Sequence, residues 1–427
     1  MIDIKIIRDN PGFIKDMLMK RGLNLPIDEL LEWDKEKRRL MIEVQNLRHR
    51  KNIVSLEIAN MKKEGRDPTA LMQEMKTLTD EIARLEDRIA GLENKINYVM
   101  MRIPNIPHES VPPGTSEEDN VEVRRWGKIP EFDFEVKDHD EIAIGLGLLE
   151  IERASKASGA RFYYLKNELV KLNLALIRFA LDLLAKKGFE IYQTPYMLRR
   201  WVIEGVTSLQ DFEDMIYKIE GEDLYLIATS EHSLAALHAN EVLDGRRLPL
   251  RYAGISPCFR KEAGAHGKDT KGIFRVHQFE KVEQFVFCKP EQSWEEHEFL
   301  LSNAEEIYQK LGLPYRVVNI CLGELGVVAA KKYDIEVWMP AQKRYREIVS
   351  CSNCTDYQAR RLNIRYREMP HEERTKYVHT LNSTAIATER TIAAILENYQ
   401  QKDGSVIIPE VLRPYMDGIE VLRPKKE

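Results

Sequence analysis

The chain has 427 residues, of which 43% are hydrophobic and 31% charged, and its net charge is −5. This composition supports packed cores and excludes a wholly disordered, collagen-like or disulfide-stapled chain. Five cysteines, an odd and sparse number, indicate a reducing compartment. No run approaches the roughly 20 apolar residues of a membrane span, and the N-terminus is not a signal peptide. We therefore expect a cytoplasmic protein without membrane contact, in which any polyanion meets a local basic surface.

The N-terminal part of the chain has helical patterns. Asn10-Pro11 suits the N-cap and first turn of a helix that stops before Gly22. Two apolar seams with 3–4 spacing follow, separated by the helix-breaking segment 65–68, and they predict an antiparallel helical hairpin with limbs about 50 Å long. The seam residues are Leu30, Trp33, Lys37, Leu40, Val44, Leu47, Lys51, Val54, Ile58 and Met61, then Leu71, Met75, Leu78, Ile82, Leu85, Ile89, Leu92, Ile96 and Val99.

Charge is unevenly spread over this hairpin. Between Lys35 and Arg66 ten basic residues face four acidic ones, whereas the return limb is acidic. A one-sided basic limb favours a phosphate backbone as partner, although a dimerising coiled coil with lysines that tune pairing stays an alternative. The candidate phosphate contacts are Arg38, Arg39, Arg48, Arg50 and Lys51.

Prolines and a polar run at 104–120 mark a linker, so we expect a helical arm at 1–103 and a second domain at 121–427. Strands are predicted at 189–192, 224–228, 250–259, 273–288 and 335–339, with helices near 163–187, 290–311 and 385–400. Long strands joined by loops indicate an α+β fold, an antiparallel sheet flanked by helices. No GxGxxG or Walker loop is present, so a nucleotide would be held in another way.

The most informative segment runs from Phe259 to Glu283. A strand from Ile273 with period two places Arg275, His277, Phe279, Lys281 and Glu283 on one face, and Arg260 lies on the preceding strand. A solvated outer face would explain such a row. Two arginines, a ring and a carboxylate on one hairpin would instead clamp a phosphate, stack a base and hold an amine or hydroxyl.

These residues carry a resemblance that extends over nearly the whole chain. The segment 259–283 resembles motif 2 of the class II aminoacyl-tRNA synthetases in its seryl form, and 188–195 resembles motif 1. Thr388-Glu389-Arg390-Thr391 resembles motif 3 in the archaeal and eukaryotic branch, where bacterial members have small residues. Thr229-Ser230-Glu231 matches the loop that seryl enzymes use for serine, and the basic hairpin matches their tRNA-binding arm.

The resemblance implies roles around ATP. Arg260 would bridge the α-phosphate and the serine carboxylate, with Arg390 as a second catalytic cation. Glu262 would contact the adenine amino group, and Phe279 would stack on the ring with Val276 nearby.

At the triphosphate end, Arg275 and Arg390 would hold the β- and γ-phosphates. Glu347 and Ser350 would ligate Mg²⁺ with phosphate oxygens. Strict strand alternation puts these two residues on opposite faces, so their cooperation requires a bulge or a strand end.

Serine selection is also implied. Glu283 and Thr384 would bind the hydroxyl, in a segment that includes Asn382, and unpaired polar groups would reject alanine. Thr229 and Glu231 would bind the α-amino group, although alone this triplet is more typical of a capping box before a helix. The residues implied for serine are Thr229, Glu231, Arg260, Glu283, Asn382 and Thr384.

The implied activity is formation of seryl-adenylate from L-serine, ATP and Mg²⁺, and transfer of serine to tRNA(Ser), and to the selenocysteine tRNA where a cell has one. The implied assembly is a homodimer in which the arm of one subunit serves the other. No zinc is expected, because Cys351 and Cys354 form a lone CxxC. His266 and His277 are interpreted as structural, since adenylate formation needs no protein base.

Two alternatives stay open at this point. One is an enzyme that activates a small amino acid for a carrier protein, which the hairpin argues against. The other is a catalytically inactive interaction protein that kept the fold, which the retained charged residues argue against.

Overall fold

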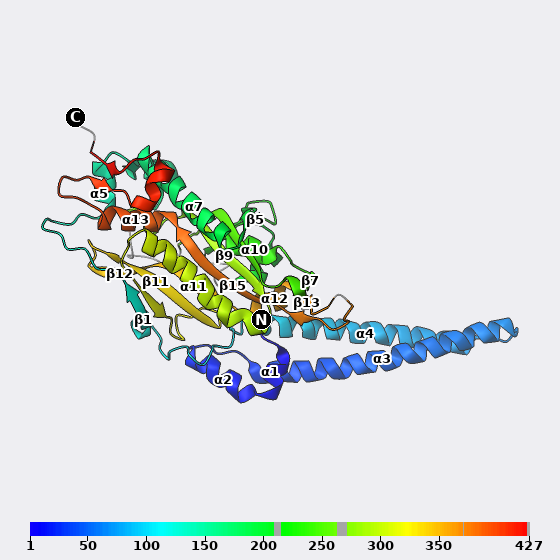
Figure 1. The fold of residues 1–427 in the computed structure, drawn as a ribbon. Coiled ribbons are helices and arrows are strands. Elements are labelled where there is room, and N and C mark those ends of the chain that lie inside the picture. The colour runs from blue at the N-terminus through cyan, green and yellow to red at the C-terminus, as the bar shows by residue number, and fades with distance from the viewer. Residues whose placement is uncertain (209–214, 263–270, 370, 425–427) are drawn as a thin grey trace. The chain divides into compact units, whose positions relative to one another are not determined.

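The computed structural model describes residues 1–208, 215–262, 271–369 and 371–424 (Figure 1). His266 and the loop around it lie outside these ranges. The chain divides into two compact units, one of Ile2–Pro104 and one of Met1 with Asn105–Glu427.

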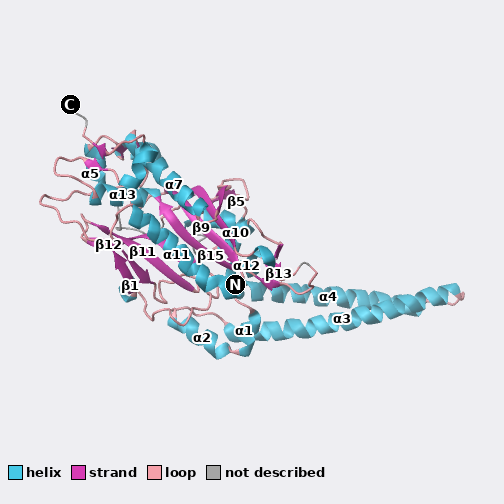
Figure 2. Ribbon diagram, viewed as in Figure 1, coloured by secondary structure: helices cyan, strands magenta, loops and turns pink. Residues whose placement is uncertain are grey.

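The first unit consists of helices (Figure 2). Helices α1 (Ile4–Asp9) and α2 (Pro11–Lys20) precede the long pair α3 (Ile27–Lys63) and α4 (Thr69–Met100). The Asn10 side chain accepts a hydrogen bond from the Phe13 amide and Pro11 opens α2, so the predicted cap is confirmed.

The two long helices pack along the predicted seams. Their central contact is a cluster of buried residues, Leu40, Val44, Ile82, Leu85 and Leu92, flanked by Trp33, Leu47 and Ile89. The seam residue Lys37 pairs with Glu93 across the hairpin at 2.9 Å. The two limbs therefore meet along the seams that the heptad pattern predicts.

The second unit is built on an eight-stranded sheet with the order β1-β10-β11-β12-β15-β9-β8-β4. All neighbouring strands are antiparallel except β4 and β8, so the predicted antiparallel sheet flanked by helices is confirmed. The strands of this sheet are β1 (Val121–Trp126), β4 (Glu190–Gln193), β8 (Leu250–Phe259), β9 (Gln278–Cys288), β10 (Tyr315–Asn319), β11 (Lys331–Met339), β12 (Arg344–Asn353) and β15 (His379–Ala387).

Helices and short strands complete this unit. The helices are α5 (His139–Gly145), α6 (Glu152–Ser158), α7 (Glu168–Lys186), α8 (Arg200–Val206), α10 (Ser230–Ala236), α11 (Ser293–Lys310), α12 (Tyr357–Leu362) and α13 (Thr388–Asn398). The short strands are β2 (Leu149–Glu150), β3 (Tyr164–Leu165), β5 (Met197–Leu198), β6 (Tyr225–Leu226), β7 (Val242–Asp244), β13 (Arg365–Arg367), β14 (Lys376–Tyr377), β16 (Val406–Ile407) and β17 (Val421–Leu422). The 3₁₀ turns are η1 (Glu117–Asp119), η2 (Gly245–Arg247), η3 (Pro290–Gln292) and η4 (Glu410–Met416).

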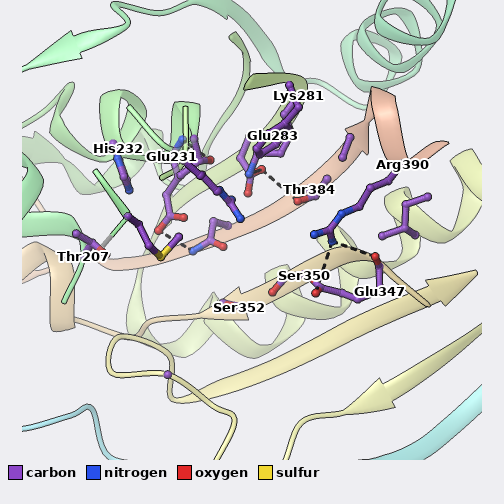
Figure 3. Close-up of a pocket in the computed structure, with 18 of the residues that line it drawn as sticks. Thr207, Glu231, His232, Lys281, Glu283, Glu347, Ser350, Ser352, Thr384 and Arg390 are labelled. Atoms are coloured by element: carbon purple, nitrogen blue, oxygen red, sulfur yellow. Dashed lines mark hydrogen bonds and ion pairs between the residues drawn. The ribbon is translucent and has the colours of Figure 1, made fainter. Parts of the chain in front are cut away.

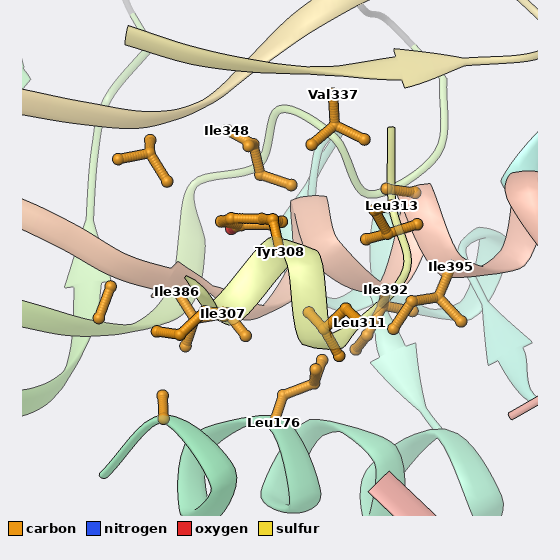
Figure 4. Packing of buried hydrophobic residues seen from close by; sticks show 14 of the residues in the cluster. Leu176, Ile307, Tyr308, Leu311, Leu313, Val337, Ile348, Ile386, Ile392 and Ile395 are labelled. Atoms are coloured by element: carbon orange, nitrogen blue, oxygen red, sulfur yellow. The ribbon is translucent and has the colours of Figure 1, made fainter. Parts of the chain in front are cut away.

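The core lies on one face of the sheet. Tyr308 of α11 and Leu311, the residue that follows this helix, pack between Leu176 of α7 and the sheet residues Val337 and Ile348 (Figure 4). Because side chains alternate along a strand, the opposite face of the same strands is left for other residues, and it carries the site described below.

Three predicted strand boundaries are wrong: β11 begins at Lys331 and not at 335, β6 covers only Tyr225–Leu226, and the third is the start of β9. The strand expected from Ile273 begins at Gln278. The Ile273 amide donates to the His139 ring and the His277 amide to the Arg161 carbonyl, so this segment bonds to a helix start and a loop and not to a strand. Arg275 is therefore placed by a loop and not by strand alternation.

Candidate active site

All of the residues that the sequence singled out for nucleotide, serine and metal binding line one cavity of about 380 Å³ (Figure 3). It lies on the face of β9 that carries Lys281 and Glu283, which alternate with Val282 of the core. Lys281 and Glu283 are buried and Arg275, His277 and Phe279 are half-buried, so the alternative of a solvated outer face is wrong. The residues are Thr229, Glu231, Arg260, Glu262, Arg275, Val276, Phe279, Glu283, Glu347, Ser350, Asn382, Thr384 and Arg390.

At one end of the cavity, Glu283 is held between two donors. It is 1% exposed, its carboxylate lies 2.5 Å from the Lys281 ammonium, and the Thr384 hydroxyl donates to it at 3.4 Å. Burial raises the pKa of Glu283, and the Lys281 ammonium opposes that rise. The sequence analysis placed Lys281 on this face but gave it no role. Lys281 could have been assigned to the site by the same two-residue alternation along the strand that identified Glu283.

Glu231 lies beside this pair. Its carboxylate accepts from Gln358 at 2.8 Å and from Asn382 at 3.1 Å. Burial, followed by the nearby Glu283 charge, raises the pKa of Glu231 to about 7. A partly buried carboxylate with this pKa is suited to a ligand that brings its own positive charge.

The expected capping box at this helix start is wrong. The Thr229 hydroxyl does cap α10, accepting from the Glu231 amide at 3.2 Å. The third residue of the helix, where a capping box has its acid, is His232, and Glu231 stands one position too early. Glu231 is therefore directed into the cavity.

Arg260 lies over Phe279 in the same cavity. Its guanidinium carbon is 5.0 Å from the ring centroid, and its Nε donates to the Ala228 carbonyl at 3.4 Å. Next to it, Glu262 and Arg275 form an ion pair of 2.8 Å. The cavity therefore holds an aromatic face, two guanidinium groups and a carboxylate within one loop and hairpin.

A bulge brings Glu347 and Ser350 together. On β11, Ile335 is opposite Val349 but Glu336 is opposite Glu347, so Ile348 is the extra residue of β12. This places Glu347 on the same side as Ser350 (Figure 3), and the bulge that the sequence analysis required is confirmed. Arg390 donates to the Glu347 carbonyl at 3.0 Å, and its guanidinium lies 3.6 Å from the carboxylate.

The residues before Arg390 anchor the start of α13. Glu389 is 2% exposed, accepts from the Glu280 amide at 3.0 Å and from the Tyr163 hydroxyl, and burial raises its pKa to about 7. The Thr388 hydroxyl donates to the Glu280 carbonyl at 3.3 Å. Residues larger than glycine are accommodated here because their side chains bond to β9.

The cysteines of this unit are free thiols. Cys351 and Cys354 are both buried, and neither forms a disulfide. The Cys354 sulfur accepts from the Asn382 amide at 3.6 Å, and burial raises its pKa well above the usual value.

The hairpin arginines are largely engaged with acids of the hairpin itself. Arg38 pairs with Asp34 at 3.1 Å, Arg48 with Glu86 at 2.6 Å and Arg50 with Glu74 at 2.8 Å. The acidic return limb thus neutralises part of the basic limb. The pairs of Arg48 and Arg50 are exposed and individually weak, so they leave these two arginines available to a stronger anion, whereas Asp34, the partner of Arg38, is buried and also binds Arg8.

Comparison with known proteins places this geometry in a class. Residues 214–399 match the tRNA synthetase class II core domain (G, H, P, S and T). The fold is shared with a Giardia lamblia prolyl-tRNA synthetase solved with prolyl-adenylate, at a TM-score of 0.57 and 17% identity over 65% of this chain and 57% of that one. The second unit is the catalytic core of a class II aminoacyl-tRNA synthetase, and the chain is a ligase.

Closer relatives define the family. Residues 1–107 match the seryl-tRNA synthetase N-terminal domain. A serine–tRNA ligase of Methanocella arvoryzae is 55% identical over 99% of this chain and 100% of its own length. A seryl-tRNA synthetase of Pyrococcus horikoshii, solved with ATP, is 53% identical with a TM-score of 0.92, and both chains are covered fully. A cytoplasmic enzyme of Naegleria fowleri, solved with AMP, is 38% identical with a TM-score of 0.87 over 100% of this chain and 99% of its own. The chain belongs to the seryl-tRNA synthetase family.

Proposed function

We propose that this chain activates L-serine with ATP in the cavity described above and then charges tRNA(Ser). A serine carboxylate oxygen attacks the α-phosphorus, the bond to pyrophosphate breaks, and a ribose hydroxyl at the tRNA 3′ end later attacks the acyl carbon and releases AMP. The observation that carries the proposal is the convergence of Arg260, Arg390, Glu231 and Glu283 on one cavity. Arg260, between the two carboxylates and the Phe279 ring, stabilises the charge that develops at phosphorus.

ATP would occupy the part of the cavity between Phe279 and Arg390. The adenine ring stacks on Phe279 beside Val276, and Glu262 accepts from its amino group. Arg275 and Arg390 bind the β- and γ-phosphates. Support comes from the 2.8 Å pair between Glu262 and Arg275, which places an adenine-binding carboxylate next to a phosphate-binding cation.

Glu347 and Ser350 would hold a Mg²⁺ ion that neutralises phosphate charge. The donor set fits this ion, because a carboxylate and a hydroxyl are hard oxygen ligands and the bulge at Ile348 turns both to one side. Arg390 lies within 3.6 Å of the Glu347 carboxylate and keeps that group oriented toward the cavity. We expect no zinc in the serine site.

Serine would be selected by the buried pair of carboxylates. Glu231 binds the ammonium together with Thr229 and Asn382, Arg260 binds the carboxylate, and Glu283 with Thr384 binds the hydroxyl. Alanine would leave the Glu283 and Thr384 oxygens without their partner in a desolvated pocket, which makes its rejection strong.

The helical arm, residues 1–103, would bind tRNA through Arg38, Arg39, Arg48, Arg50 and Lys51. Phosphate groups compete with the exposed carboxylates that Arg48 and Arg50 now contact, and each of these pairs is worth little in water. Recognition of this kind measures shape and backbone, so a tRNA for selenocysteine with a similar arm would be accepted too.

The catalytic core would act as a homodimer in the cytoplasm. Support for the dimer comes from apolar side chains that are exposed around α7, β4 and β5: Val170, Leu174, Ile191, Met197 and Trp201. Among the helices that the structure describes, none has the length and apolar content needed to cross a bilayer.

The proposal is tested by ATP–pyrophosphate exchange with each amino acid in turn, with and without tRNA(Ser). We expect exchange with serine and with no other amino acid, and charging of tRNA(Ser) when the tRNA is present. Exchange without charging would favour transfer to a carrier protein, and absence of exchange with every amino acid would favour an inactive interaction protein. Either result would overturn the proposal.

A further inference from the structure

A buried histidine holds the loop from which the nucleotide-binding residues project. His139 opens α5 and is 4% exposed. Its Nε2 accepts from the Ile273 amide at 3.2 Å, and its Nδ1 lies 3.0 Å from the carboxylate of Glu397, which is fully buried. Since Nε2 accepts, the proton of the neutral ring is on Nδ1 and is donated to Glu397.

Glu397 connects this histidine to two further parts of the site. It lies on α13, the helix that begins just before Arg390, and its second carboxylate oxygen accepts from the Ala341 amide at 3.0 Å. Ala341 belongs to the turn between β11 and β12. One carboxylate therefore joins the Arg390 helix, the turn that leads into the Glu347 strand and, through His139, the loop at Ile273.

The loop is also packed tightly against the histidine. Gly272 has a φ of +70°, and a Cβ placed on it would lie 2.1 Å from His139 Nε2. On the other side, the Phe274 carbonyl accepts from Arg390 Nε at 3.3 Å, and the Phe274 ring lies under the Arg346 guanidinium at 4.4 Å. The segment 272–274 is thus fixed from two sides immediately before Arg275 and Val276.

Asp138, His139 and Glu397 also bring three potential ligand atoms within 4.8 Å of one another, which raises the question of a metal ion. Both ring nitrogens of His139 are already engaged, one as acceptor from an amide and one as donor to Glu397. No lone pair of the ring is left for a cation, so the cluster is a hydrogen-bonded one.

We infer that His139 and Glu397 are positioning residues for ATP, which fix the loop 272–276 so that Arg275 and Val276 meet the nucleotide. This rests on the proposed ATP subsite. Neither residue lines the cavity, so they act through the loop and not through contact with a substrate. The serine end of the cavity is built mainly from α10, β9 and β15, and none of these elements contains His139, Glu397 or the loop 272–276.

The test uses three substitutions of His139 in the full-length enzyme, with KM for ATP and for serine measured by pyrophosphate exchange. H139Q can still accept from the Ile273 amide, H139N keeps only a donor toward Glu397, and H139L keeps neither. We expect H139N and H139L to raise the ATP KM about tenfold, a factor that corresponds to about 1.4 kcal/mol. H139Q should raise it less than about threefold, and the serine KM should stay within about twofold in all three.

The matched control is His238→Leu. His238 also has both ring nitrogens engaged, with Nδ1 2.8 Å from Glu241 and Nε2 2.9 Å from the Tyr252 hydroxyl, but neither of these partners lines the cavity. Its loss should leave the ATP KM unchanged. Gly272→Ala keeps the histidine but displaces the loop, so it should raise the ATP KM as H139L does. It replaces H139L in the comparison if H139L does not fold.

Parallel rises in both KM values, or an H139Q variant as impaired as H139L, would overturn the inference. Arg275→Ala separates this from an error in the ATP subsite itself. If Arg275→Ala leaves the ATP KM unchanged, the proposed ATP subsite is wrong. If Arg275→Ala raises the ATP KM but the His139 variants have the wild-type ATP KM, only the positioning role is refuted.

Discussion

Replacing Lys281 by methionine tests how the hydroxyl-binding carboxylate keeps its charge. The Lys281 ammonium lies 2.5 Å from Glu283, and the two residues are 6% and 1% exposed. Burial already raises the pKa of Glu283, and Lys281 is the largest opposing influence. Without the ammonium the pKa of Glu283 rises further, so a larger fraction of the carboxyl is protonated at any given pH instead of remaining a buried, unpaired charge.

The size of the effect follows from the hydrogen bond that is lost. A hydrogen bond to a charged group contributes about 1.5–3 kcal/mol, compared with about 1 kcal/mol for a neutral one. Exchanging the charged acceptor for a neutral one costs about 0.5–2 kcal/mol, which raises the serine KM of K281M by roughly 2- to 30-fold at neutral pH, while the ATP KM stays unchanged. The carboxylate is the form present above the pKa, so the defect shrinks as pH rises, by up to about tenfold per unit.

The assay is serine-dependent pyrophosphate exchange between pH 6 and pH 9. Glu231 titrates with a pKa of about 7 in the wild type as well, so the ratio of the K281M and wild-type serine KM values is compared at each pH. The double variant K281M/E283Q lacks the titrating group, and its ratio should not depend on pH. If the ratio of serine KM values for K281M is also independent of pH, the reasoning is refuted, because Lys281 would then contribute packing and not charge.

Three further outcomes are expected. Arg260→Ala should abolish serine-dependent exchange and leave the circular dichroism spectrum and elution volume unchanged; near-normal exchange would contradict the role proposed for it. The wild-type serine KM should fall as pH rises through 7, because the pKa of Glu231 is raised to about 7 and its carboxylate binds the ammonium. Glu231→Gln should remove that dependence and raise the serine KM about 100-fold, and a persisting pH dependence would assign it to another group. Deletion of residues 35–95 should spare exchange and cripple tRNA charging, whereas equal loss of both would argue against a separable arm.

The fold was predictable where local pattern and tertiary structure agree. The seams of α3 and α4 follow a period that only a paired helix satisfies, and Asn10-Pro11 identifies a helix start by hydrogen bonding alone. The short helix α1 and the strand β1 were not predicted. Ile4–Asp9 is less than two turns long, and Val121–Trp126 is an edge strand with mostly exposed side chains, so neither has a clear apolar period.

The site was predictable as a set of residues but not as a geometry. The direction of Glu231 depends on its being the second and not the third residue of α10, and the sequence does not fix that count. The pairing of the hairpin arginines with Glu74 and Glu86 depends on the register between limbs that are joined by a turn. His139 lies far from Ile273 in sequence, and nothing local indicates that the two meet.

The cavity and the core share the same strands because two bulges interrupt the alternation of side chains. On β12 the bulge at Ile348 lets Ile348 and Val349 both pack in the core, and Glu347 and Ser350 on either side of them face the cavity. On β15 the register shifts between Thr384 and Ile386, so that Ala385 and Ile386 are both core residues and Thr384 and Ala387 line the cavity.

In each strand an apolar doublet therefore replaces the single inward residue of a regular strand. The doublets lie on neighbouring strands of the sheet. A regular alternation would send Ile386 into the cavity and Ala387 into the core, and it would separate Glu347 from Ser350. The cavity face is thus specified by the positions at which the sequence departs from a period of two, which is why a regular alternation read along β12 separates Glu347 from Ser350.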